Sequence, residues 1–115
     1  MGKVVINTCY GGFGLSDEAC EWLLNHGFGD ISENPEFDPN RPHNSLNRKY
    51  YLGYSFSRHD PLLIQCIEEL GKEANGFSAR LMVYEFNGDL YQIDEYDGME
   101  YVRTPDTERW ININN

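Results

Sequence analysis

Residues 79–104, ARLMVYEFNGDLYQIDEYDGMEYVRT, decide the predicted fold. They alternate strand-forming runs with two turn signals, Asn87-Gly88 and Asp97-Gly98. Asn-Gly and Asp-Gly favour two-residue hairpin turns of type I′, because both central residues of such a turn need positive φ angles. The stretch therefore predicts two successive hairpins built from three antiparallel strands: residues 79–86, 89–96 and 99–104.

Two-residue turns also predict which residues face each other, since opposed residues in an antiparallel ladder keep a constant sum of positions. This register places Met82 opposite Ile93 on the more apolar face, which we expect to meet the helices. On the same face, Glu95 and Glu100 lie opposite each other beside Arg80. Two facing carboxylates indicate an acid pair with a raised pKa, a cation-binding site, or an ordinary ion pair with Arg80 at the end of the sheet.

Two helices are predicted ahead of these strands. Ser16 is a good N-cap for the first helix, and Gly27 is placed to end it. Asp60-Pro61 starts the second helix, because Asp caps the free amides and proline at the first helical position loses nothing by lacking an N–H. The apolar residues that follow fall on one face at helical spacing: Leu63, Cys66, Ile67, Leu70 and Ala74. We expect this helix to end at Asn75-Gly76.

The remaining segments complete the predicted order. Residues 3–8 form a β-branched run that favours a strand, and residues 28–49 are predicted to be a polar loop. Residues 50–56 alternate in a way that favours a further strand. The order β-α-loop-(β)-α-β-β-β indicates a single α+β domain over residues 1–115, in which two helices pack on one face of a mainly antiparallel sheet.

Composition restricts the classes of function. The 115 residues include 19 acidic and 9 basic side chains, for a formal charge of -10. Such a surface repels phosphate backbones, so general nucleic-acid binding is disfavoured. We find neither a signal-peptide core nor an apolar run of about 18 residues, and we expect a cytoplasmic protein that does not enter a membrane. The three cysteines lack disulfide and metal-ligand spacing, so no metal or cofactor is expected.

A glycine-rich loop separates the first predicted strand from the first helix. Such loops can present backbone amides to a phosphate, but this one matches neither the P-loop nor the GxGxxG spacing, which favours a tight turn. Cys9 ends the strand before the loop and is a weak candidate for a catalytic nucleophile. Together with a Glu95 and Glu100 acid-base pair, it keeps a small enzyme as an alternative. The glycines of the loop are Gly11, Gly12 and Gly14.

Residues 41–58 gather arginine, lysine and tyrosine side chains. This combination is typical of sites that stack a nucleotide base and pair with its phosphate, and also of protein interfaces. The candidate residues for binding a small nucleotide or a partner here are Arg48, Lys49, Tyr54 and Arg58. The competing candidate is the acidic face of the second helix, including Glu68 and Glu69, which could imitate nucleic-acid phosphates towards a host protein.

Three blocks taken together resemble a family of small proteins encoded in bacteriophage and other viral genomes. They are GGFGLS at 11–16, RHDP at 58–61 with EELG at 68–71, and EYDGME at 95–100. The resemblance brings no catalytic residues with it. It implies an accessory protein in the host cytoplasm that binds and inhibits or sequesters a host factor, antiviral-defence components included. An oligomerisation module that pairs through a sheet edge is a further alternative.

Overall fold

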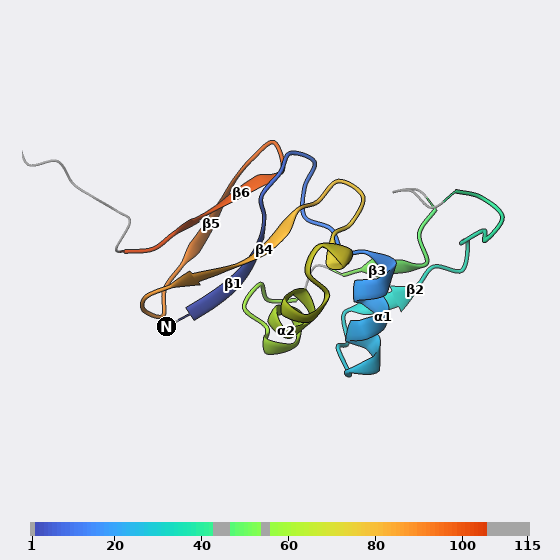
Figure 1. Cartoon of the computed structure of the whole chain (residues 1–115), viewed down its shortest axis with the longest axis horizontal. Helices are drawn as coiled ribbons and strands as arrows, with labels where there is room; N and C mark the ends of the chain where they lie inside the picture. Colours follow the sequence, from blue (N-terminus) through green and yellow to red (C-terminus); the bar gives the residue numbers. More distant parts are fainter. Residues whose placement is uncertain (1, 43–46, 54–55, 106–115) are drawn as a thin grey trace, which may run out of the picture.

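The computed structural model describes residues 2–42, 47–53 and 56–105. Within them the strands form three two-stranded antiparallel sheets, β1 with β4, β2 with β3 and β5 with β6, and the helices lie on one side of β1 and β4 (Figure 1). This confirms the predicted α+β class with two helices on antiparallel strands. The elements are β1 (Gly2–Asn7), α1 (Asp17–Asn25), β2 (Ile31–Glu33), β3 (Tyr50–Leu52), α2 (Pro61–Leu70), the 3-10 helix η1 (Gly71–Ala74), β4 (Leu81–Phe86), β5 (Gln92–Tyr96) and β6 (Met99–Arg103).

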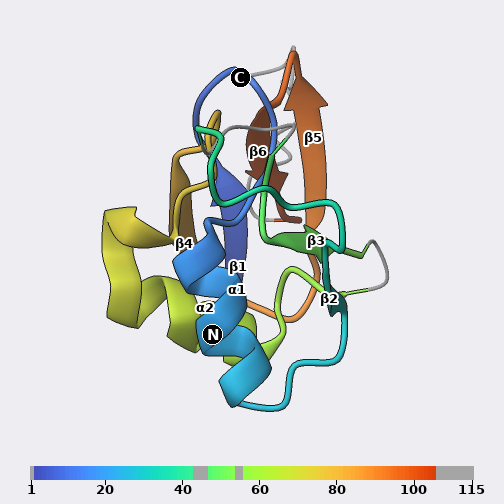
Figure 2. The same ribbon diagram turned by 90° about the vertical axis from the view of Figure 1, so that its right-hand side faces the viewer.

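Strand β1 lies between β4 and the β5–β6 hairpin (Figure 2). One edge pairs with β4, and the other is bonded to residues from two distant segments. The Val5 N–H donates to the Arg58 carbonyl at 2.9 Å, and the Asn7 N–H donates to Glu100 Oε1 at 2.8 Å. Both edges of β1 are therefore occupied, which suits its buried side chains.

The helix starts are set by the predicted caps. Ser16 Oγ accepts from the Ala19 N–H at 3.1 Å, and Asp60 Oδ1 accepts from the Leu62 N–H at 2.8 Å. The prediction that the second helix continues to Asn75-Gly76 was wrong. Gly71, at a φ of +58°, ends α2 after Leu70, and the chain continues as η1 instead of as α-helix.

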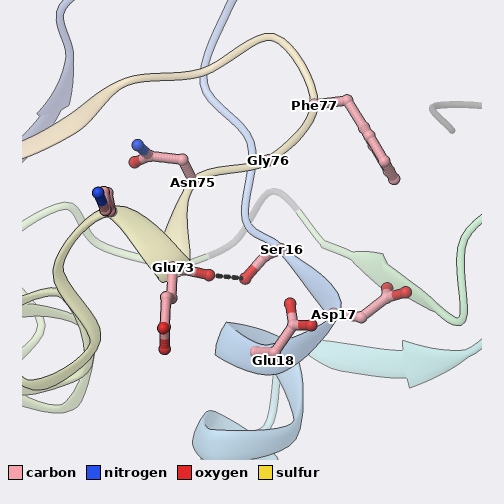
Figure 3. A pocket seen from close by; sticks show the side chains of 8 residues that line it. Ser16, Asp17, Glu18, Glu73, Asn75, Gly76 and Phe77 are labelled. Atoms are coloured by element: carbon pink, nitrogen blue, oxygen red, sulfur yellow. Dashed lines mark hydrogen bonds between the residues drawn. The ribbon is translucent and has the colours of Figure 1, made fainter. Parts of the chain in front are cut away.

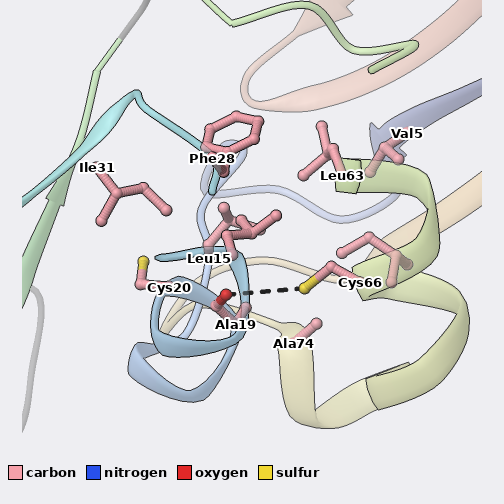
Figure 4. Close-up of a cluster of buried hydrophobic side chains, with 11 residues drawn as sticks. Val5, Leu15, Ala19, Cys20, Phe28, Ile31, Leu63, Cys66 and Ala74 are labelled. Carbon is pink, nitrogen blue, oxygen red and sulfur yellow. Dashed lines mark hydrogen bonds between the residues drawn. The ribbon is translucent and has the colours of Figure 1, made fainter. Parts of the chain in front are cut away.

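A buried apolar cluster joins the two helices to β1 (Figure 4). Leu15, Leu23 and Leu63 are fully buried in it, and Val83 of β4 packs against it. The prediction that the Met82 face of this strand meets the helices was wrong, because Met82 is 41% exposed. Pairing with β1 places Val83 opposite the buried Val5, so this residue pair turns towards the helices instead.

One of the two predicted hairpins forms. Asp97 and Gly98 have φ angles of +52° and +91°, and β5 pairs with β6 in the predicted register, in which Glu95 faces Glu100. The hairpin predicted at Asn87-Gly88 was wrong. Among the described non-glycine residues only Asp97 has a positive φ, so position 87 does not adopt a type I′ turn. Strand β4 pairs with β1 instead.

The segment predicted as a polar loop contains strand β2, which pairs with β3 in a register that places Ile31 opposite Leu52. Asn34 follows β2 and is buried, and its Nδ2 donates to the Arg48 carbonyl at 2.7 Å. Residues 50–52 form β3, which is the first part of the strand predicted over 50–56, while Tyr54 and Ser55 lie outside the described residues.

Candidate functional site

The three loop glycines lie where backbone segments approach closely. A Cβ at Gly98 would collide with the Gly12 nitrogen, and a Cβ at Gly76 would come within 2.8 Å of the Gly14 carbonyl carbon. The Gly11 N–H donates to the Asp97 carbonyl at 3.3 Å. Of the loop glycines themselves, Gly11 is required by packing, because a Cβ there would come within 2.7 Å of Ser78, and Gly11 and Gly12 both have positive φ angles, of +119° and +98°. A Cβ at Gly14 would make only an ordinary contact, at 3.9 Å from Gly76.

The Cys9 thiol is turned towards backbone and amide acceptors. Its Sγ lies 3.2 Å from the Ser78 carbonyl and 3.5 Å from Asn7 Oδ1. The other two thiols belong to the apolar cluster, where burial raises the pKa of Cys20 to about 12 and that of Cys66 to about 11. Both buried thiols are therefore protonated at neutral pH and act as packing groups.

Glu100 forms a two-pronged ion pair with Arg58. The Arg58 Nη1 and Nη2 atoms lie 2.7 Å and 2.8 Å from the two Glu100 carboxylate oxygens. Glu100 is only 8% exposed, and the Arg58 guanidinium lies 3.8 Å from the centre of the Phe13 ring. Such a bidentate pair is strong and geometrically specific. Arg58, named from the sequence as a ligand-binding residue, is held by this carboxylate.

Glu95 faces Glu100 in the ladder, yet the two carboxylates serve different donors. Glu95 Oε1 accepts from the Gly98 N–H at 2.7 Å, within its own turn. The interpretation that Arg80 compensates this end of the sheet was wrong, because Arg80 belongs to the segment beside β1 and the compensating cation is Arg58.

The other candidates in the basic segment have separate partners. Arg48 Nη2 donates to the Leu15 carbonyl at 3.3 Å, and Lys49 Nζ lies 3.9 Å from Glu21 Oε1. Tyr54 lies outside the described residues. The structure therefore holds Arg48, Lys49 and Arg58 by three different acceptors, and a phosphate would have to compete with each of them.

The two glutamates of α2 tie the helix to its neighbours. Glu68 Oε2 lies 2.9 Å from Lys3 Nζ, and this contact raises the pKa of the Lys3 ammonium. Glu69 accepts from Gln65 at 3.2 Å and from Trp22 Nε1 at 2.8 Å, and these hydrogen bonds lower the pKa of the Glu69 carboxyl. Glu68 thus connects α2 to β1, and Glu69 connects it to α1.

A hollow of about 550 Å³ lies between the start of α1 and the end of η1 (Figure 3). Its lining includes Asp17, Glu18 and Glu73. Lys72 is its one basic residue, and Phe77, which is 55% exposed, lines it as well. We call this site the acidic hollow. Carboxylates beside an exposed aromatic ring suit a cationic guest, since the ring face also attracts positive charge.

The acidic hollow was not predicted from the sequence. Asp17 and Glu18 were part of a helix start, and Glu73 was a polar position on a helix predicted to continue to Asn75. The break at Gly71 brings η1 to the start of α1, where Ser16 Oγ donates to the Glu73 carbonyl at 2.6 Å. A helix-ending glycine was the only available signal, and it does not specify which residues become neighbours.

Comparison with protein-family models, curated proteins and solved structures found no match for this chain. In the part of the chain that the structure describes, neither helix has the length and apolar character needed to cross a bilayer. The same residues contain no group of three or more His, Cys, Asp or Glu side chains arranged to hold a metal ion.

Proposed function

We propose that this chain is a phage- or virus-type accessory protein that binds a host factor and thereby inhibits or sequesters it. The acidic hollow is the observation that supports this function most directly. Its guest is a cationic side chain on the host factor, an arginine or a lysine. The formal charge of -10 and the resemblance to small viral proteins provide the context.

The chemistry of the acidic hollow favours such a guest. Glu18 and Glu73 are exposed and line the hollow from α1 and η1, so each carboxylate can accept from a guanidinium or ammonium group that enters it. Phe77 adds an aromatic surface that a guanidinium can stack on. The surrounding negative charge accelerates the approach of a basic partner and makes binding sensitive to salt.

The nucleotide version of this function has weaker geometric support. It requires Arg58 to bind a phosphate, but both of its terminal nitrogens already donate to Glu100. The enzyme alternative depends on Cys9 or on Glu95 with Glu100, and each of these side chains already has a partner. Cys9 contacts the Ser78 carbonyl, Glu95 accepts from the Gly98 N–H, and Glu100 pairs with Arg58. In the acidic hollow, in contrast, the Glu18 and Glu73 side chains are exposed.

The test is capture of proteins from a host lysate on the tagged chain, at several salt concentrations, followed by mass spectrometry of bound proteins and released small molecules. One double variant, Glu18→Gln with Glu73→Gln, neutralises the acidic hollow. The matched control, Glu33→Gln with Glu36→Gln, removes the same charge from exposed residues outside that lining. We then measure the affinity of each captured protein for the three chains.

We expect the hollow variant to weaken binding about tenfold, which corresponds to about 1.4 kcal/mol, and the control to bind as the natural chain does. Binding should also weaken as salt rises. Equal loss in both double variants would mean that only overall charge matters. Unchanged binding in the hollow variant, or capture of a nucleotide without a protein, would reject the proposal.

A further inference from the structure

Strand β4 has one edge paired with β1 and one edge turned outward. The Thr8 N–H donates to the Arg80 carbonyl at 2.7 Å, which identifies the hydrogen-bonded pairs of this ladder. Because such pairs alternate along an antiparallel ladder, the backbone groups of Leu81, Val83 and Glu85 point away from β1. Among the described residues, β1 is the only strand that pairs with β4.

Strands β4 and β5 are the outer strands of the row that also contains β1 and β6, and they differ in how they are protected against pairing with another strand (Figure 2). On one side, β5 carries Asp94 and Glu95 among five residues, and charges of this kind prevent one edge strand from pairing with another. On the other side, β4 reads LMVYEF, with Glu85 as its one charged residue. An apolar edge six residues long is a template for a further strand.

We propose that β4 pairs with β4 of a second copy of this chain, antiparallel and about a two-fold axis that passes midway between the two Val83 residues. The outward residues are spaced evenly on either side of Val83, so the edge is complementary to itself. In this register Val83 exchanges both backbone hydrogen bonds with its counterpart, and Leu81 faces Glu85 of the other copy.

One outward group of this edge is already occupied, because the Leu81 N–H donates to Asn75 Oδ1 at 2.8 Å. The Leu81 carbonyl points the same way and can accept from the Glu85 N–H of the second copy. If the contact with Asn75 is kept, the Leu81 N–H cannot also donate to the Glu85 carbonyl of the second copy. The Leu81–Glu85 pair at each end of the ladder then contributes one hydrogen bond, and the central Val83 pair contributes two.

The side chains favour the same register. Met82 faces Tyr84 of the second copy, and a thioether beside an aromatic ring is a favourable cross-strand pair. The two Glu85 side chains do not face each other. Met82 and Tyr84 also line a hollow of about 390 Å³ with Ile6 and Tyr101, on the sheet face away from the helices. Pairing places the two hollows on one four-stranded sheet, in the order β1-β4-β4-β1.

This dimer does not depend on the proposed function. Its response to salt is opposite to the response expected for binding of a basic partner in the acidic hollow. Two copies that each carry a charge of -10 repel each other, so screening by salt strengthens their association. Binding of a basic partner in the acidic hollow weakens under the same change. The two proposals can therefore fail separately.

The test combines sedimentation velocity with amide hydrogen exchange, from micromolar to millimolar protein and at low and high salt. We expect a monomer–dimer equilibrium that shifts towards dimer with salt. The amides of Val83 and Glu85 should exchange more slowly as the protein concentration rises. A chain that stays monomeric throughout, or a Val83 amide that is equally protected at every concentration, would overturn the proposal.

The variant Glu85→Pro removes one outward N–H and leaves the bonds to β1 in place. Its matched control, Glu85→Ala, loses the same carboxylate and keeps the N–H. We expect the proline variant to dimerise at least tenfold more weakly than the alanine variant, with both folded by circular dichroism. Equal dimerisation of the two variants would overturn the proposal.

If the proline variant does not fold, Met82→Glu serves as the second variant. It changes a side chain that is already 41% exposed and leaves the backbone edge intact. The new carboxylate would be buried against Tyr84 of the second copy, so we expect the same loss of dimer. Full dimerisation of this folded variant would count against the register.

Discussion

The carboxylate of Glu100 accepts hydrogen bonds from two segments that are far apart in the sequence. Arg58 precedes α2 and is 42 residues away, and the Asn7 amide is 93 residues away. Both contacts involve a side chain that is 8% exposed. At this position one residue therefore fixes the β5–β6 hairpin to β1 and to the start of α2.

Replacing this carboxylate should cost more than replacing one at the surface. We expect Glu100→Gln to lower the free energy of unfolding by about 3 kcal/mol, the low end for a broken buried pair, because Arg58 retains some solvent contact. The matched control is Asp94→Asn, which breaks the exposed 2.7 Å pair with Arg103 and should cost about 0.5 kcal/mol. Urea unfolding of the three chains measures both losses. Similar losses in the two variants would show that the buried pair contributes no more than a surface pair.

The Arg58–Glu100 pair could not be predicted from the sequence. Spacing rules identify partners within one helix or across one hairpin, and this pair joins a loop to a strand of another hairpin. The sequence did predict that Glu100 faces Glu95, because the register across Asp97-Gly98 depends only on the turn between the two strands. It left open an acid pair with a raised pKa, a cation site or an ion pair between Arg80 and Glu95, and that ion pair depended on the hairpin that does not form.

Among the structural elements, the two glycine turns offer a direct comparison. Gly98 and Gly88 have φ angles of +91° and +93°, so a side chain is strained at either position. Only Gly98 lies against the backbone of Gly11 and Gly12, whereas nothing lies within 4 Å of the Cβ position at Gly88. The difference between the two positions therefore isolates the packing of the hairpin on the glycine loop.

We expect Gly88→Ala to cost about 1 kcal/mol for backbone strain alone. Gly98→Ala should cost at least about 2 kcal/mol more, because the hairpin must move away from the loop and Asn7 Nδ2 would lose its 2.7 Å bond to the Gly98 carbonyl. Thermal or urea unfolding of both variants tests the difference. Equal losses of unfolding free energy in the two variants would show that the hairpin does not pack against the glycine loop.

The predictable elements are those with local signals. Ser16 and Asp60 define the helix starts because a cap acts within its own turn, and Asp97-Gly98 defines a hairpin for the same reason. Asn87-Gly88 carries an equally good signal, but β4 pairs with β1, which places Val83 opposite the buried Val5 and against the apolar cluster. That pairing depends on contacts about 80 residues apart, which local propensity does not contain. The acidic hollow depends on the same kind of distant contact.

For the molecule as a whole, the charge of -10 acts against the folded state. Carboxylates that repel each other lie closer together in the native chain than in the unfolded one, and salt screens this repulsion. We expect the melting temperature to rise by a few degrees between low and moderate sodium chloride, measured by circular dichroism at a concentration where the chain is monomeric. The Glu33→Gln and Glu36→Gln double variant should show a smaller rise. A melting temperature that falls with salt would mean that attractive pairs dominate the electrostatics.

The hydrogen bonds on both edges of β1 also determine the order in which the chain can fold during synthesis. Strand β1 leaves the ribosome well before its partner in the ladder, β4, and Glu100 comes later still. Val4, Val5 and Ile6, all buried in the native state, are therefore without their ladder partners on the growing chain until residues 81–86 have been made. The ladder around β1 therefore cannot form until β4 has been made, and the nascent chain is most open to chaperones and to aggregation before that point.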